Sequence, residues 1–361
     1  MPIKARHLLL PFSLIYGSVV RLRNTLYDKK FWRSTTFDLP LICVGNLSVG
    51  GTGKTPMVEY LVSILQDKYK TATLSRGYKR KTKGFLIAGE KSEAADIGDE
   101  PMQIHKKFPQ ITVAVAEERV IGIPQLLFAK PETEVIILDD AFQHREVAAG
   151  LNILLTDYNN PYSNDLLLPA GNLRDSKKSS ERADIIIVAK CKSNLTEIEK
   201  KSFTAKLKPT AKQQIFFTTI DYKSAYRLFS KGNDYGLTGK SDVLLVCGIA
   251  NPKSILEELQ VKAHSVKLLA FKDHHIYDSV DIKKIKDEFS KINSLNKIII
   301  TTEKDAARLS KFENELEELP FFVLPMSHKF LFAEEKNFEK IIFEFVGSFE
   351  GQTDNAVDDP T

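Results

Sequence analysis

The feature that most constrains the fold is an apolar run that leads into a glycine-rich turn and then into a helix start. Residues Leu41–Val44 are typical of a buried strand, and Ser48-Val-Gly-Gly-Thr-Gly-Lys-Thr55 follows a few residues later. Backbone N–H groups in such a turn, together with the positive end of the helix, bind phosphate oxygens. A plain glycine turn does not explain Lys-Thr at the helix start. We therefore predict a nucleotide phosphate-binding loop.

From this loop we expect ATP and Mg²⁺ as cofactors. Lys54 would neutralise charge on the β- and γ-phosphates, and the Thr55 hydroxyl would ligate magnesium. Ser48 occupies the position of the first glycine in the strict G-x-x-x-x-G-K-[ST] pattern, so the match is incomplete by one residue. The residues expected to contact the nucleotide are Gly50, Gly51, Thr52, Gly53, Lys54 and Thr55.

Two carboxylates follow a second apolar run. Val135–Leu138 is followed by Asp139 and Asp140. An acid at the tip of a buried parallel strand is where a P-loop enzyme needs a magnesium partner. We predict both as metal ligands; the alternative is that one of them caps the start of a helix.

The 361 residues suffice for two α/β domains. Short apolar runs alternate with helix-like stretches, which is typical of a parallel sheet covered on both faces. The predicted fold is a P-loop NTPase-like, mainly parallel sheet flanked by helices, with a smaller α/β domain joined by a two-stranded hinge. The runs are Leu41–Val44, Thr71–Leu74, Ile111–Val115, Val135–Leu138, Ile153–Leu155 and Ile185–Val188, then Val243–Val246, Val266–Leu269 and Ile298–Thr301.

Two extended, aromatic segments, Gln214–Ile220 and Phe321–Leu324, are predicted to pair as the hinge. The final helix-like stretch, Phe338–Val346, is assigned to the smaller domain. The predicted division is an N-terminal helix at 1–33, a P-loop kinase domain at 34–212, a smaller domain with hinge strands and final helix at 213–347, and a disordered tail at 348–361.

The N-terminal segment predicts a membrane-associated helix. Its longest apolar stretch, Leu8–Val20, is too short to span a bilayer. On a helical wheel one stripe is apolar, and residues 1–33 carry seven Lys or Arg against one acid. An interfacial helix needs both features. A signal peptide and a core-packing helix are the alternatives. The stripe consists of Leu8, Phe12, Ile15, Val19, Leu22 and Leu26; Ser13, Gly17, Arg21 and Asn24 lie opposite.

The basic charge is local, because the chain's net charge of +4 falls to −2 without residues 1–33. A general nucleic-acid surface is therefore not expected. The three cysteines, Cys43, Cys191 and Cys247, lack metal-ligand spacing and are predicted to be buried thiols.

Several motifs, in this order, resemble the tetraacyldisaccharide 4′-kinase (lipid A 4′-kinase) family. They are SVGGTGKTP, Leu74-Ser-Arg-Gly-Tyr78, Gly98-Asp-Glu-Pro101, Ile137-Leu-Asp-Asp-Ala-Phe-Gln-His-Arg145, Leu168-Pro-Ala-Gly171 with Leu173-Arg174, Phe271-Lys-Asp-His274 and Thr302-Glu-Lys-Asp-Ala306. The resemblance implies that ATP phosphorylates the 4′-hydroxyl of a tetraacylated glucosamine disaccharide 1-phosphate, a lipid A precursor. It also implies a monotopic enzyme at the cytoplasmic face of the inner membrane, and it implies no obligate protein partner.

The resemblance further implies that Asp99 and His274 together activate the acceptor hydroxyl, alongside Lys54 as a third catalytic residue. A neutral His accepts a proton while a carboxylate orients it. A surface-loop role for His274 and a shift of the role to His275 remain open.

Four residues are candidate substrate contacts: Arg76, Arg119, Arg174 and Asp175. Arg binds phosphate through its bidentate fork, although an exposed Arg is often only a solvated charge. Asp175 stands where the family usually shows Glu, and Asn172 where it commonly has Pro. Residues Thr302–Asp305 could face ATP or simply start a helix.

Rival interpretations are a GTPase, a metal phosphoesterase and a membrane-associated P-loop ATPase or adaptor without a lipid acceptor. Lys304 is followed directly by Asp305, which does not fit a guanine-reading Asn-Lys-x-Asp motif. The Asp273-His274-His275 triplet lacks the further carboxylate cluster that a phosphoesterase needs. Product analysis with the lipid separates the remaining alternatives.

Overall fold

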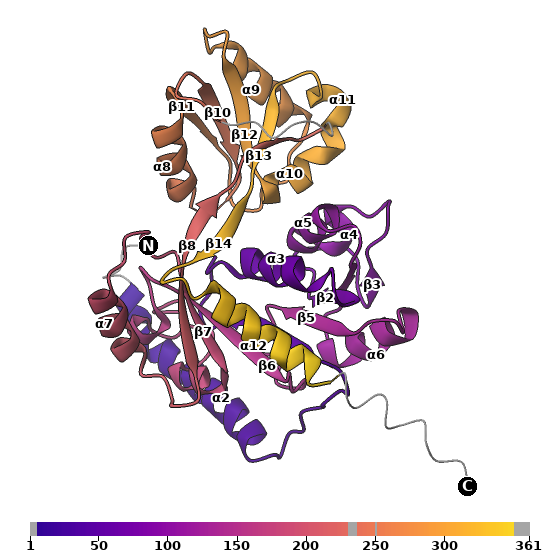
Figure 1. Cartoon of the computed structure of the whole chain (residues 1–361), viewed down its shortest axis with the longest axis vertical. Coiled ribbons are helices and arrows are strands. Elements are labelled where there is room, and N and C mark those ends of the chain that lie inside the picture. Colours follow the sequence, from indigo (N-terminus) through magenta and orange to yellow (C-terminus); the bar gives the residue numbers. More distant parts are fainter. Residues whose placement is uncertain (1–5, 230–236, 250, 350–361) are drawn as a thin grey trace.

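The computed structural model describes residues 6–229, 237–249 and 251–349, which form a larger and a smaller α/β body joined by two strands (Figure 1). The predicted tail lies outside the described residues from residue 350 onward, as do the first five residues of the N-terminal segment.

The larger body contains a nine-stranded sheet in the order β14-β8-β7-β6-β1-β5-β2-β4-β3. The seven inner strands of this order, β8-β7-β6-β1-β5-β2-β4, pair in parallel, and the two edge strands β3 and β14 are antiparallel to their neighbours. The strands are β1 (Leu41–Asn46), β2 (Thr71–Ser75), β3 (Leu86–Ile87), β4 (Thr112–Val115), β5 (Val135–Asp139), β6 (Leu151–Asp157), β7 (Ile185–Ala189), β8 (Gln214–Tyr222) and β14 (Met326–Phe330).

Helices cover both faces of this sheet because its central strands are apolar on both sides. In β1, Leu41 and Cys43 face one hydrophobic cluster, while Ile42 and Val44 face the other. Helices α6 (Arg119–Ala129) and α7 (Glu197–Leu207) pack on the first face, and α3 (Lys54–Leu65), α5 (Asp99–Lys107) and α12 (Glu335–Gly347) on the second. Shorter elements are α4 (Ala94–Ile97), η2 (Tyr162–Asn164) and η3 (Lys177–Arg182).

The smaller body has a five-stranded sheet in the order β11-β10-β12-β13-β9. Its strands are β9 (Tyr226–Arg227), β10 (Asp242–Cys247), β11 (Ser265–Ala270), β12 (Lys297–Thr302) and β13 (Phe321–Leu324). Its helical elements are α8 (Lys253–Lys262), α9 (Ser279–Ser290), α10 (Glu303–Leu309), η4 (Ser310–Phe312) and α11 (Glu313–Leu316). Helices α8 and α9 pack on opposite faces. Every predicted apolar run in both bodies forms a strand.

The predicted hinge is wrong in its second strand. Phe321–Leu324 forms β13, which pairs with β12 and β9 inside the smaller sheet. The partner of β8 is the next segment, β14, whose Ser327 lies opposite Asp221. The cause is burial: β13 is buried on both faces, whereas β14 alternates and suits an edge.

The prediction that the final helix belongs to the smaller body is wrong. Phe338, Ile342 and Val346 of α12 pack in the same cluster as Met57 and Leu61 of α3, so α12 covers the larger sheet (Figure 1). Because β14 and α12 follow the smaller body in the chain, the larger body is built from segments on both sides of it in sequence.

The N-terminal helix α2 (Leu10–Asp28), preceded by the single turn η1 (His7–Leu9), lies against the larger body (Figure 1). Its apolar stripe is exposed. Phe12, Ile15, Val19 and Leu22 are each more than 60% exposed. The inward face is small and polar and includes Ser13, Gly17 and Asn24. The core-packing alternative is therefore wrong for this stripe. Among the described residues, helices that are long and apolar enough to cross a bilayer are absent.

The cysteines at positions 43, 191 and 247 are buried and unpaired, as predicted. Burial raises the pKa of each thiol to about 12, so none is a ready nucleophile.

Candidate active site

The glycine-rich loop lies between β1 and α3 and is shaped by residues with positive φ. Gly50 (φ 112°) and Gly53 (φ 92°) occupy backbone conformations that side chains rarely adopt. A Cβ added at Gly50 or Gly51 would meet nothing within 4 Å, so the outer face of the loop is open. Asn46 at the end of β1 donates to the Thr52 hydroxyl at 2.9 Å and fixes the inner face. The loop therefore presents backbone groups to an incoming phosphate.

The acid pair lies beside the loop because β5 is the neighbour of β1. Asp139 is buried, and its Oδ1 has no hydrogen-bond partner among the described residues. Burial, with the charges of Glu100 and Asp140, raises the pKa of Asp139 to about 7. The stretch between β5 and β6 contains no helix, so the helix-cap alternative for these acids is wrong.

Asp140 is held as a carboxylate by two cations. Lys54 Nζ lies 3.5 Å from Asp140 Oδ1, and Arg174 donates two hydrogen bonds to the same carboxylate. Although burial opposes it, these charges hold the pKa of Asp140 below its usual range. Arg174 also donates to Asn46 at 2.7 Å, so it joins the loop to the acid pair.

The oxygen ligands suit magnesium rather than a softer metal. No group of three or more His, Cys, Asp or Glu able to hold a metal occurs in the part of the chain that is described. Mg²⁺ is commonly held by one or two carboxylates plus substrate phosphates and water. The unpartnered Asp139 oxygen and the Thr55 hydroxyl at the start of α3 fit that pattern.

Arg119 is not available to bind phosphate, contrary to prediction. Its side chain is fully buried, and its guanidinium donates to the backbone carbonyls of Ala116 at 2.6 Å and Asp139 at 3.1 Å. Burial lowers the pKa of Arg119 to about 10. It braces the ends of β4 and β5. Arg76, in contrast, is exposed immediately after β2.

Asp175 also has a different role from the predicted substrate contact. It is completely buried and accepts hydrogen bonds from Asn24 of α2 (2.8 Å), Ser179 (2.7 Å) and Arg182 (3.1 Å). Its carboxylate anchors the N-terminal helix to the larger body and is closed to a ligand.

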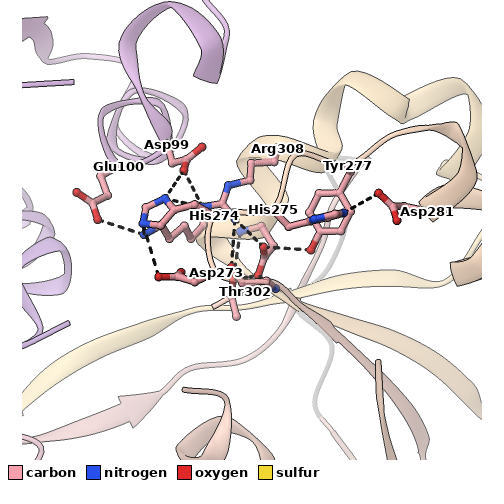
Figure 2. A network of polar contacts seen from close by, with 12 residues as sticks. Asp99, Glu100, Asp273, His274, His275, Tyr277, Asp281, Thr302 and Arg308 are labelled. Carbon is pink, nitrogen blue, oxygen red and sulfur yellow. Dashed lines mark hydrogen bonds and ion pairs between the residues drawn. The ribbon is translucent and has the colours of Figure 1, made fainter. Parts of the chain in front are cut away.

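Asp99 and His274 meet across the two bodies. Asp99 begins α5 of the larger body, and His274 lies in the loop after β11 of the smaller one. Asp99 Oδ2 and His274 Nδ1 are 3.0 Å apart (Figure 2). His275 instead contacts Asp281 at 2.7 Å and stacks on Phe271. The geometry thus pairs His274, and not its neighbour, with Asp99.

Two cations that sequence reasoning did not assign to this pair also contact it. Arg308 donates to Asp99 Oδ2 at 2.6 Å and to Asp305 at 3.1 Å (Figure 2). Although burial opposes it, the hydrogen bond and charge of Arg308 lower the pKa of Asp99. Lys304 Nζ lies 3.3 Å from both Glu100 Oε1 and His274 Nε2.

The Thr302–Asp305 segment is a helix start. The Thr302 hydroxyl accepts from the Asp305 N–H and caps α10, while Asp305 accepts from Thr302, Tyr277 and the Gly248 N–H. The i, i+3 spacing of Asp305 and Arg308 could have indicated their ion pair. Nothing local could have indicated that Arg308 reaches Asp99.

A second set of ion pairs holds the bodies together. Lys107 of α5 donates to Glu59 of α3 and to Glu303 of α10, each at 2.7 Å. Burial, with the charge of Glu303, raises the pKa of Glu59 to about 7.

The loop at the carboxyl edge of a parallel sheet, next to a strand that ends in an acid pair, defines a nucleotide-binding protein of the P-loop class. Comparison with known proteins gives the finer grouping. The family described as "Tetraacyldisaccharide-1-P 4'-kinase" matches residues 5–346. The chain therefore belongs to the tetraacyldisaccharide-1-P 4′-kinase family.

Relatives named "Tetraacyldisaccharide 4'-kinase" match almost end to end. The protein from Parabacteroides distasonis is 46% identical over 95% of this chain and 95% of its own. The one from Bacteroides thetaiotaomicron is 45% identical over 95% of this chain and 94% of its own. The one from Flavobacterium johnsoniae is 45% identical over 94% of this chain and 97% of its own. A crystal structure of LpxK from Aquifex aeolicus in complex with ATP superposes with a TM-score of 0.74 at 33% identity, covering 95% of this chain and 99% of that one.

Proposed function

We propose that this kinase transfers the γ-phosphoryl group of ATP to the 4′-hydroxyl of a tetraacylated glucosamine disaccharide 1-phosphate. The products are ADP and the 4′-phosphorylated lipid. The observation that carries the proposal is the family match over residues 5–346, which spans both bodies. The 3.0 Å contact between Asp99 and His274 supports a phosphoryl transfer to a hydroxyl, because such a transfer needs a base at the acceptor.

In the proposed mechanism, His274 removes the proton of the acceptor hydroxyl. The Asp99 carboxylate only accepts hydrogen bonds, so Nδ1 of His274 carries the ring proton and Nε2 is left as the base. Lys304 now lies 3.3 Å from Nε2; an acceptor hydroxyl would take its place, and Lys304 would keep Glu100 as its partner. The acceptor oxygen bonds to the γ-phosphorus, the bond to the β-phosphate oxygen breaks, and the proton stays on Nε2.

The nucleotide side of the mechanism is assigned to the loop and the acid pair. The amides of Gly50–Thr55 and the Lys54 ammonium bind the phosphates. We assign Thr55 and Asp139 as Mg²⁺ ligands, with Asp140 as a further ligand or a charge that orients Lys54. When bound, Mg²⁺ neutralises charge that develops on the transferred group. Arg174 and Arg76 remain candidates for substrate phosphates.

We also propose that α2 lies in the headgroup layer at the cytoplasmic face of the inner membrane. Its exposed apolar stripe provides burial in lipid, and the cations around it attract anionic headgroups. The opposite side of the helix is hydrogen-bonded to the larger body. Ser13 donates to the Leu167 carbonyl at 3.0 Å, and Tyr16 donates to the Arg174 carbonyl at 2.8 Å. An acyl-chain substrate would thus be delivered beside the loop that carries Arg174.

The reaction is tested by incubating the purified protein with ATP, Mg²⁺ and the disaccharide 1-phosphate, followed by mass analysis of the lipid. One added phosphate on the 4′-oxygen is expected. ATP consumption with unmodified lipid would instead favour the ATPase or adaptor alternative. Omitting the lipid should leave little ATP hydrolysis, because closure of the two bodies keeps water from the transferred group.

The membrane assignment is tested with a variant that replaces Phe12, Ile15 and Val19 by Ser. It should bind anionic liposomes more weakly and raise KM for the lipid more than KM for ATP. The matched control replaces Val261 and Leu295 of the smaller body, which are even more exposed than the three α2 residues. If the control loses as much liposome binding as the α2 variant, the assignment is wrong.

A further inference from the structure

The hinge touches the nucleotide loop through a buried histidine that the mechanism above does not use. His328 lies on β14, one of the two strands that join the bodies (Figure 1), and is only 3% exposed. Its Nε2 lies 2.8 Å from the carbonyl oxygen of Gly53, and its Nδ1 lies 2.8 Å from the Thr218 hydroxyl of β8. Both hinge strands therefore meet the last glycine of the loop through one imidazole ring.

The protonation of this ring is determined by its partners. A carbonyl oxygen only accepts, so Nε2 carries the proton and donates to Gly53. Nδ1 then accepts from the Thr218 hydroxyl. Burial lowers the pKa of His328 to about 4, and the nearby positive charge of Lys190 acts in the same direction. The ring is thus neutral in the tautomer that the contacts require.

The contact fixes the peptide that begins α3. The Gly53 carbonyl also accepts from the Met57 N–H at 3.2 Å, so two donors hold its direction. Because a peptide unit is planar and trans, the N–H of Lys54 points the opposite way from that carbonyl. Holding the carbonyl therefore aims the Lys54 amide. A Cβ on Gly53 would lie 3.1 Å from the imidazole, so the close approach also requires glycine.

A second anchor holds the same loop without the hinge. Lys190, after β7, donates to the Gly51 carbonyl at 2.5 Å and to Asp157 at 2.8 Å. All three residues belong to the larger body. The His328 contact differs because β14 continues directly from β13 of the smaller sheet. Any twist of the hinge would move the imidazole against Gly53.

We propose that His328 is a positioning residue that sets the nucleotide affinity of the Gly50–Thr55 loop and makes that affinity depend on the arrangement of the hinge. The proposal rests on the phosphate-binding role of the loop. It concerns ATP and ADP and leaves the lipid site unaffected.

The test uses two amides that differ in reach. In His328→Gln the side-chain amide occupies roughly the place of Nε2 and can still donate to Gly53, whereas in His328→Asn it occupies the place of Nδ1 and cannot. With the full chain in detergent micelles, ADP affinity is measured by calorimetry, together with KM for ATP, KM for the lipid and Tm. We expect Asn to weaken ADP binding and raise KM for ATP about threefold to tenfold, the effect of one hydrogen bond. KM for the lipid should stay within about twofold, and Gln should recover most of the loss.

Two further variants make the result decisive. Lys329→Gln, on the same strand but exposed, should behave as wild type. Thr218→Val should give a smaller loss than His328→Asn, because it removes only the hydroxyl that donates to Nδ1 and leaves the contact of Nε2 with Gly53 possible. Equal losses in Gln and Asn, or parallel rises in both KM values, would overturn the proposal. If Lys54→Ala also leaves ADP binding unchanged, the loop assignment itself is wrong; if only Lys54→Ala weakens it, the His328 proposal alone fails.

Discussion

The two sides of the proposed site are assembled in different ways. The phosphate side comes from one continuous loop and the end of the adjacent strand, all within the larger sheet. The acceptor side joins Asp99 to His274, 175 residues apart in sequence and on different bodies. The first side is formed whenever the larger body is folded. The second exists only while the bodies are in contact, so the two sides should respond differently to substitution.

The largest expected effect is on the phosphate side. Lys54→Ala should lower kcat by about 10³-fold to 10⁵-fold, because it removes a cation from the charge that develops on the transferred phosphoryl group. Thr55→Ala should also abolish turnover by removing a magnesium contact. Steady-state kinetics with unchanged Tm would establish this result. Lys201→Ala, on an exposed part of α7, is the control. Near-normal kcat in both loop variants would contradict the assignment.

On the acceptor side we expect a somewhat smaller loss with little change in ATP affinity. His274→Ala and Asp99→Ala should each lower kcat by about 10²-fold to 10⁴-fold, as for removal of a general base. The double variant should be scarcely worse than the poorer single variant, because the pair acts as one unit. Fully additive losses would show independent roles. His275→Ala is the control, since His275 contacts Asp281 instead.

A third prediction links the two bodies through charge. Arg308→Gln removes the cation that lowers the pKa of Asp99, so that pKa should rise. The acid limb of the kcat/KM profile should then move to higher pH, with the loss of rate confined to acid pH, because Asp99 stays ionised near neutrality. Arg308→Lys keeps the charge and should shift the limb less. An unchanged acid limb in the Gln variant would separate Arg308 from Asp99.

The smallest expected effect is on stability. Burial and the charge of Glu303 raise the pKa of Glu59 to about 7, above the unfolded value of 4.5. Its contribution is therefore complete below pH 4.5 and is lost as the pH rises through 7. Gln103 and Lys107 donate to different oxygens of Glu59, so Glu59→Gln keeps an acceptor for only one of them, but it does not ionise. Its Tm relative to wild type should therefore rise by about 3 °C between pH 5 and 8. The exposed Glu257→Gln serves as the control, and a pH-independent difference would contradict the linkage.

Sequence reasoning placed residues correctly where their position depends on local chain order. The end of one strand and the start of the next helix determine where Lys54 and Thr55 lie, and the adjacency of β1 and β5 brings Asp139 beside them. The Asp99 and His274 pairing came from the family resemblance. No periodicity could have predicted it, because it depends on how two bodies face each other.

Sequence reasoning failed where a side chain could turn either way. Arg119 lies near the carboxyl edge of the sheet, as a phosphate ligand would, but its guanidinium turns into backbone carbonyls. Asp175 follows Arg174 directly, yet one side chain faces Asp140 and the other is buried under α2. The final helix has a clear apolar face, but that face does not reveal which body it covers. These outcomes depend on tertiary packing that a single sequence does not specify.

The return of the chain to the larger body has a consequence for how the protein is made. The edge strand β14 and the helix α12, whose Phe338 and Ile342 complete the core beneath α3, are the last described elements to leave the ribosome. The smaller body is complete by Leu324, while the larger one still lacks its cover. A chain cut short before residue 335 would therefore keep every element of the smaller body but leave the apolar face of α3 without the side chains of α12. The helix that begins at the glycine loop is therefore covered last, by a segment near the opposite end of the sequence.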